Sequence, residues 1–216
     1  MDDAITSEDT ARELKSSGAG CGSPDPIGLI REEHELQLEL CCLLETIADN
    51  LPRRVSHRLA STAVTILEKS FPAHMQFEDE ALFPLLRKRA AAGAAVLSAL
   101  DCLADEHERD AAALVELTDA LREAADKGAA RNPEMFGYPL RGFFDGQRRH
   151  IAWEDRVIVP AARDLLTPVD LAELQQWVMA SDHYALVDVR RMKSGLALCR
   201  TCPDGQHAAG HRGSEQ

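Results

Sequence analysis

Apolar residues recur at intervals of three and four along four long segments of the chain, at residues 26–50, 55–90, 96–127 and 134–165. This spacing follows one face of an α-helix and is typical of the core stripe of a helical bundle. Short connections that carry Gly and Pro separate the segments, so neighbouring helices should run antiparallel. The pattern predicts an all-α fold, an up-and-down four-helix bundle.

The rest of the chain predicts one more helix and two irregular ends. Thr167 and Pro168 form a helix start signal ahead of a fifth amphipathic segment, which predicts an additional C-terminal helix. Residues 1–25 are polar and rich in Ser and Gly. We therefore expect a flexible N-terminal segment at 1–25, the bundle at 26–166, the C-terminal helix at 167–196 and a flexible tail at 197–216.

Each of the four stripes carries one histidine, and two of them add a glutamate one turn later. These six residues are His34, His74, Glu78, His107, His150 and Glu154. A residue and its fourth successor lie about 40° apart on one helix face, so each Glu shares the inner face with its His. Burying an unpaired carboxylate costs several kcal/mol. A lone histidine on such a stripe is usually a hydrogen-bonded core residue, but four with two carboxylates predict a metal-binding core.

The number and kind of ions follow from the ligand types. One ion would be satisfied by four ligands, whereas two ions use all six, with both carboxylates bridging. Imidazole with carboxylate suits iron or manganese, zinc is not excluded, and the lack of cysteines at this depth disfavours a purely structural zinc site. We predict two non-haem iron ions bridged by carboxylates.

Two stretches of the chain repeat one pattern, HMQFEDEALFP at residues 74–84 and HIAWEDRVIVP at residues 150–160. The aromatic residues three after each histidine, Phe77 and Trp153, are expected to pack beside the metal and exclude water. Asp79 and Asp155 lie about 100° further round the helix than the glutamates, so they fit either behind the ligands or at the surface. We favour the surface for both.

The composition of the chain limits the kinds of partner that it can bind and the cellular compartment that we expect for it. The formal net charge of −12 argues against a nucleic-acid partner, because phosphate binding needs a basic face. The longest uncharged run, residues 90–100, is about half of the roughly 20 residues that a membrane-spanning helix needs, so no membrane partner is expected. No secretory signal is visible at the start. We expect a cytoplasmic protein whose six cysteines are reduced.

Four phrases carry a resemblance to a known family: IREEHE, FPAHMQFEDEALFPLL, DEHERD and RRHIAWEDRVIVPA. From about residue 25 to residue 166 the chain resembles the hemerythrin-like proteins, also called HHE cation-binding domains. The resemblance implies a four-helix bundle with a non-haem di-iron site that meets dioxygen, nitric oxide or peroxide.

The chain departs from the oxygen-carrying hemerythrins at Ala111, where they place a second histidine on the third helix. The remaining set of H, HxxxE, H and HxxxE is similar to that of the repair-of-iron-centres proteins. The loss of a histidine argues against simple oxygen carriage.

The leading hypothesis is a di-iron protein that binds or reduces dioxygen, peroxide or nitric oxide in stress defence or sensing. The alternative is an iron donor for the repair of damaged iron-sulfur clusters. The tail brings Cys199, Cys202, His207 and His211 together with a spacing too short for the usual zinc finger. We interpret the tail as a reactive-thiol segment through which a protein partner could be met.

Overall fold

The computed structural model describes residues 25–181, and its regular elements are all helical. In chain order they are α1 (Pro26–Asp49), α2 (His57–Phe77), η2 (Glu78–Leu82), α3 (Phe83–Arg89), α4 (Ala95–Lys127), α5 (Pro133–Trp153), η3 (Glu154–Ile158), α6 (Val159–Leu165) and α7 (Pro168–Ala180). The elements η2 and η3 are single π-helical turns. Each joins its neighbours without a break, so α2–η2–α3 and α5–η3–α6 form two long rods.

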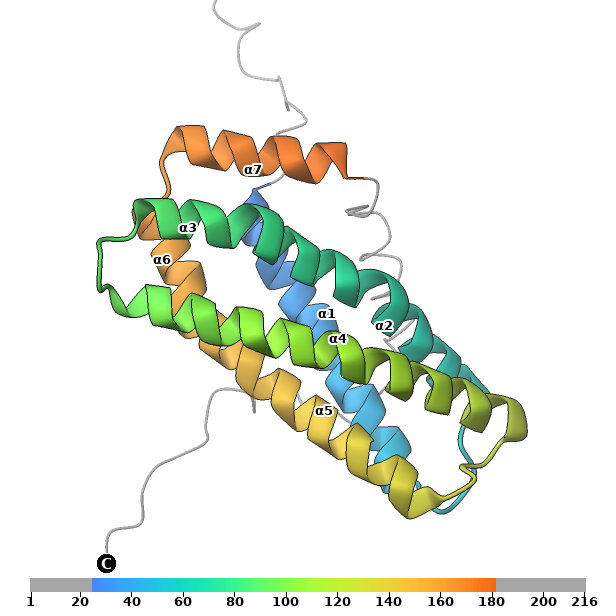
Figure 1. Cartoon of the computed structure of the whole chain (residues 1–216). Coiled ribbons are helices and arrows are strands. Elements are labelled where there is room, and N and C mark those ends of the chain that lie inside the picture. Colours follow the sequence, from blue (N-terminus) through green and yellow to red (C-terminus); the bar gives the residue numbers. More distant parts are fainter. Residues whose placement is uncertain (1–24, 182–216) are drawn as a thin grey trace, which may run out of the picture.

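The four rods pack as a bundle in which α1 lies beside α2 and α5, and α4 lies beside the same two helices. Figure 1 shows the rods running lengthwise and α7, in orange, lying across one end. Helix α7 contacts α1 and η2. The all-α prediction, a four-helix bundle with an additional C-terminal helix, is confirmed.

The helix ends lie where the sequence supplies caps. The side chains of Asp25, Ser56 and Asn132 each accept a hydrogen bond from a backbone N–H in the first turn of α1, α2 and α5. Thr167 and Asp170 form a reciprocal capping box at the start of α7. Gly128, at a positive φ of 67°, ends α4. These caps define where the helices begin and end along the chain.

The π turns arise where proline follows in the two repeated phrases. Phe83 N–H donates to Glu78 C=O and Val159 N–H donates to Glu154 C=O, five residues back. Pro84 and Pro160 come next, and a proline inside an α-helix lacks an N–H and clashes with the carbonyl four residues earlier. The wider turn accommodates the proline without interrupting the rod.

A polar layer divides the core into two hydrophobic clusters. One cluster includes Leu40, Phe71 and Leu121, and the other includes Ile30 and Leu100. The histidines lie between these groups along each helix. Apolar packing therefore closes the polar layer from both ends of the bundle.

Some sequence-based expectations concern residues that lie partly or wholly outside the described range, and one expectation is contradicted. Helix α7 ends at Ala180, and the remainder of the expected helix at 167–196 lies outside the described residues, as do the segment at 1–24 and the tail with Cys199 and Cys202. The expectation that all cysteines are reduced is wrong, because Cys42 is disulfide-bonded, while Cys41 and Cys102 are free thiols. The length of the chain argues against a disulfide-dependent fold, but it does not prevent a single bridge.

Within residues 25–181, no helix combines the length and the apolar character needed to cross a membrane.

Candidate metal centre

The six residues singled out in the sequence come together in the middle of the bundle. The histidines stand on four different helices, His34 on α1, His74 on α2, His107 on α4 and His150 on α5, and the glutamates open the two π turns. All six are at most 5% exposed.

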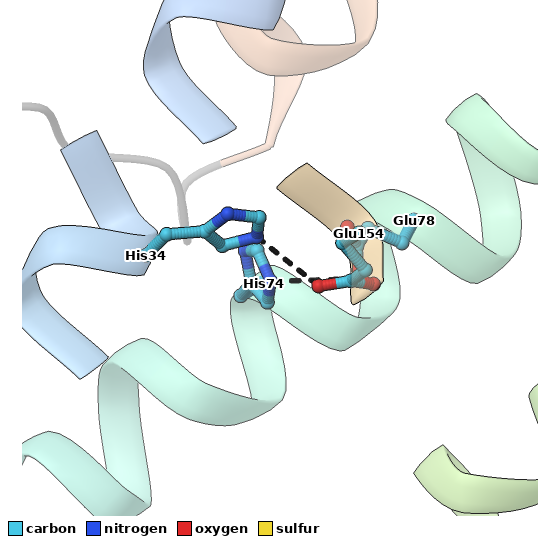
Figure 2. A group of neighbouring side chains, drawn as sticks. All are labelled: His34, His74, Glu78 and Glu154. Atoms are coloured by element: carbon cyan, nitrogen blue, oxygen red, sulfur yellow. Dashed lines mark ion pairs between the residues drawn. The ribbon is translucent and has the colours of Figure 1, made fainter. Parts of the chain in front are cut away.

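Two groups of four potential ligands share the same pair of carboxylates. His34 and His74 form one group with Glu78 and Glu154, and His107 and His150 form the other with the same two glutamates. Within each group, one ligand atom per residue lies within 4.8 Å of the others. Figure 2 shows the first group, in which both imidazoles point toward the carboxylates.

Each carboxylate lies between histidines of different groups. Glu154 approaches His34 Nε2 at 3.1 Å with Oε2 and His150 Nε2 at 3.2 Å with Oε1. Glu78 Oε2 lies 3.4 Å from both His74 Nε2 and His107 Nε2. The two glutamates therefore occupy the positions that bridging ligands would take.

Several of these inner atoms have no hydrogen-bond partner in the described part of the chain. They are both carboxylate oxygens of Glu78 and of Glu154, together with His34 Nε2 and His74 Nε2. Although some lie close to one another, their alignment is not that of a hydrogen bond. Leaving buried acceptors unsatisfied is costly. A shared cation would satisfy all of them at once, so the donor set fits a metal.

The outer nitrogen of every histidine is bonded to a carboxylate. The Nδ1 to oxygen distances are 3.0 Å for His34–Asp155, 2.8 Å for His74–Glu33, 2.9 Å for His107–Asp79 and 2.8 Å for His150–Glu106. A carboxylate accepts, so Nδ1 carries a proton and Nε2 is the nitrogen that faces the centre, where it could bind a metal. This pattern is characteristic of histidines that bind metals.

The outer carboxylates repeat between the two halves of the chain. Glu33 and Glu106 each directly precede a histidine and bond to the histidine of the following helix. Asp79 and Asp155 each follow a central glutamate and bond across the halves, to His107 on α4 and His34 on α1. The centre thus has an approximate two-fold symmetry in its outer contacts as well as its inner ones.

Asp79 and Asp155 lie at the surface, as favoured, but they also stand behind the histidines, which was the other alternative. Their side chains are 40% and 37% exposed, yet each bonds to a buried imidazole. Reasoning along a single helix placed them on the flank, but that flank faces the histidine of the neighbouring helix. The wider π turn also reduces the angle between consecutive side chains.

Glu33 and Glu106 were missed by sequence reasoning, although a signal was present. Both halves write Glu immediately before His, in REEHE and in DEHER. Two buried or half-buried carboxylates at the same offset from a repeated histidine indicate a shared role.

The two aromatic residues of the repeated phrases have different surroundings. Phe77 is fully buried and packs against Trp177 of α7, with ring centroids 5.3 Å apart. Trp153 is 53% exposed, so its expected role in excluding water is wrong. The difference arises because α7 covers only the half that contains Phe77. Phe83 instead stacks on His107 at 5.7 Å, a contact that the repeated pattern did not predict.

Electrostatic interactions couple His34 and His150 to the carboxylate of Glu154. Burial lowers the pKa of His34, but Asp155 and Glu154 outweigh it and raise that pKa to about 9. Burial likewise lowers the pKa of His150, and Glu154 and Glu106 raise it to about 9. Burial would raise the pKa of Glu154, yet His150 and His34 hold it well below its usual range. Without a metal cation, protons on the histidines supply the positive charge of this cluster.

Glu78 contrasts with Glu154. Its burial, followed by the nearby charge of Glu154, raises the pKa of Glu78 well above the usual range. The metal-free centre therefore favours the charged form of Glu154 and disfavours the charged form of Glu78.

Comparison with known families agrees with this geometry. The family model for the Hemerythrin HHE cation binding domain matches residues 25–162, well over half of the chain. Nothing matches the chain in the searches of curated proteins and of solved structures. The matched residues run from the cap of α1 to α6 and include both groups of ligands.

Proposed function

This chain belongs to the hemerythrin HHE cation-binding family, and on that premise we propose that it is a non-haem di-iron protein which binds or reduces dioxygen, peroxide or nitric oxide. The observation that carries the proposal is the pair of four-residue groups that share Glu78 and Glu154. A single ion would need one such group, whereas the shared carboxylates suit two neighbouring ions.

The ligand roles follow from the contacts. His34 and His74 would bind one ion, and His107 and His150 the other, each through Nε2. Glu78 and Glu154 would bridge the two ions, since each carboxylate lies between histidines of the two groups.

Iron is favoured by the donors and by the charge around them. Imidazole nitrogen and carboxylate oxygen suit iron, and no thiolate is among the ligands. Two inner and four outer carboxylates surround the centre. Their six negative charges can compensate either two ferrous or two ferric ions, which favours a centre that changes oxidation state.

When bound, two adjacent iron ions supply two electrons together and leave coordination positions open to a small molecule. The chain's own residues prepare the place. The outer carboxylates hold the Nδ1 protons and orient the imidazoles, and the two hydrophobic clusters keep bulk water out.

Iron donation for cluster repair is less well supported by the site. A donor has to release its ion, but the six ligands are at most 5% exposed and four of them are held by outer carboxylates. These contacts favour retention. Transfer of iron from the loaded protein to an apo-cluster acceptor, faster than spontaneous loss, would favour the donor instead.

The proposal is tested by the iron content per chain and by visible spectra under air, peroxide and nitric oxide. We expect two iron ions in the wild type, about one in His74→Ala, and nearly none in Glu154→Ala, because the histidine serves one ion and the glutamate serves both. A protein that takes up no iron, or whose spectrum is unchanged by all three molecules, would contradict the proposal.

His57→Ala is the matched control for His74→Ala. His57 is on the same helix, is exposed and contacts Ser61 rather than the centre. Its loss should leave the iron content at the wild-type value. Loss of iron in both variants would show that the effect of His74→Ala is not one of ligation.

A further inference from the structure

A recess of about 500 Å³ lies between α4 and α5, beside the metal centre. Cys102, Glu106 and Arg109 line it from α4, and Gly142, Gly146 and Arg149 line it from α5. Its lining also includes His150, which is 5% exposed. The recess therefore extends from solvent to a histidine of the centre.

Two glycines keep this part of the seam open. A Cβ at Gly142 would meet no atom within 4 Å, and one at Gly146 would meet only Arg149 Nη2, at 4.0 Å. Neither backbone needs a positive φ, and glycine is otherwise unfavourable in a helix interior. The helix thus lacks side chains on two successive turns, where it could carry them without a clash.

The opposite half of the centre is covered. There α7 lies over Phe77 through Trp177, whereas the equivalent Trp153 is 53% exposed and lines the recess. The approximate symmetry of the ligands is therefore not matched by the cover around them. Of the two sides, the one with Trp153 offers a way in.

The charges in the recess favour anions. Its two carboxylates are engaged, Glu106 with His150 Nδ1 and Asp110 with the amide of Gln147. The guanidinium groups of Arg109 and Arg149 are exposed at the sides of the recess. The formal charges of the lining balance, but its two carboxylates are partly offset by hydrogen-bond donors, so the two guanidinium groups are the charges that remain available to an anion.

We propose that small anions reach the metal centre through this recess, drawn in by Arg149 and Arg109 and passing the Glu106–His150 pair that forms its inner wall. The proposal rests on the proposed function, because it requires a metal-loaded centre. It adds to that function an access route and a preference for negatively charged ligands.

The route is tested by the kinetics of azide binding to the iron-loaded full chain, followed by the change in visible absorption. The double variant Gly142→Leu/Gly146→Leu fills the recess without a clash at either Cβ. We expect azide association and dissociation both to slow by roughly tenfold, with the dissociation constant and the iron content unchanged. A variant that damaged the centre itself would instead change the affinity or the iron content.

Arg149→Gln tests the role of charge. Azide association should slow by roughly threefold and lose part of its dependence on ionic strength, whereas association of uncharged nitric oxide should be unaffected. Val115→Leu is the matched control, since Val115 is exposed and lines a different hollow, between α2 and α4, whose lining contains none of the four histidines. It should leave both rates unchanged.

The outcomes separate this route from the proposed function. A chain that takes up no metal contradicts both. An iron-loaded chain that binds no azide, or whose azide kinetics are the same in the wild type and the double leucine variant, contradicts the route alone. Equal slowing by Val115→Leu would also contradict it, because the effect would then not depend on the recess.

Discussion

At the scale of single residues, the outer nitrogen of each histidine decides what the inner nitrogen can do. A carboxylate that accepts from Nδ1–H fixes the tautomer and the ring orientation, and makes Nε2 a better ligand. Glu33 shows this best, because it is 3% exposed and bonds to His74 Nδ1 at 2.8 Å. Its charge is kept in the core next to an imidazole that faces the centre.

Glu33→Gln should therefore weaken iron binding without removing a ligand. The amide can still accept from Nδ1–H, but it lacks the charge that strengthens the imidazole. We expect roughly a tenfold loss of iron affinity, at the lower end of the 10–100-fold typical of such partners. Competition with a chelator measures it. Glu32→Gln makes the same change on the adjacent residue and should have no effect; equal losses would point to net charge as the cause.

The six residues that come together in the centre could be predicted from the sequence, whereas the partners of its histidines could be predicted only in part. His34 and Glu154 stand out because polar residues on an apolar stripe need an explanation. Glu33 and Asp79 do not stand out, because each sits on a helix flank where acidic residues are common. Their role depends on which helix faces that flank, and this is a property of the assembled bundle.

At the scale of elements, each π turn begins at one of the two central glutamates. Pro84 follows η2, and the wider turn that accommodates it also directs Glu78 inward and Asp79 toward His107. Such turns are often found at functional sites. The sequence showed the proline at the same offset in both phrases, but helical periodicity assumes a constant rotation per residue and does not predict a π turn.

Pro84→Ala tests whether the π turn serves the centre. Alanine restores an N–H, so the rod can return to regular α-helical bonding, which turns Glu78 relative to its neighbours. We expect helicity to be retained and iron affinity to fall by roughly tenfold in the chelator competition. Pro139→Ala, inside α5 and away from a π turn, is the control and should leave iron affinity unchanged. The same affinity in both variants would contradict a role for the turn.

Helix α7 is held to the bundle by a buried ion pair at its start. Arg89 donates to both oxygens of Asp170, at 2.8 and 2.9 Å, and Asp170 is 1% exposed and caps α7 with Thr167. The hydrogen bond from Arg89, followed by those from Thr167, holds the pKa of Asp170 well below its usual value of 3.8. Because its pKa is lowered, the carboxylate stabilises the fold at pH values above its usual pKa. This contribution is lost as the pH falls from the usual pKa toward the lowered pKa.

Asp170→Asn should accordingly destabilise the docking of α7 near neutral pH. Relative to the wild type, the loss should be full at pH 6 and should shrink below about pH 4, because the carboxylate of the undocked wild type then takes up a proton that the docked one does not, which favours undocking. Fluorescence of Trp177 in a Trp153→Phe background reports the docking, because Trp177 packs on Phe77. A difference between the variants that does not change from pH 6 to pH 3 would contradict the assignment.

At the scale of the whole molecule, two similar halves build one centre and a single added helix makes them unequal. The stripe periodicity predicts the bundle because four amphipathic helices with short connections have few ways to bury their apolar faces. The same periodicity says nothing about which half α7 covers, since Phe77 and Trp153 occupy equivalent positions. That choice is made by contacts such as Phe77–Trp177 and Arg89–Asp170, which join residues far apart in the chain.

The polar layer also means that the bundle gives up stability for its metal. Glu78 is fully buried beside Glu154, and burial raises the pKa of its carboxyl, so the metal-free fold loses stability at neutral pH by having to take up a proton there. Glu78→Gln has the same size and no charge, so the metal-free variant should be more stable than the metal-free wild type, on the order of 1 kcal/mol. Denaturant unfolding of both proteins measures this.

Iron should reverse the order of the two proteins. Bound iron stabilises the wild type by a free energy that grows with the logarithm of the ratio of free iron concentration to the dissociation constant. The variant would lack one proposed bridging ligand, so it should bind iron more weakly and gain less stability. Glu80→Gln, an exposed position in the same π turn, is the matched control and should follow the wild type in both states. If Glu78→Gln were less stable than the wild type without metal, Glu78 would contribute to the fold itself rather than to the metal.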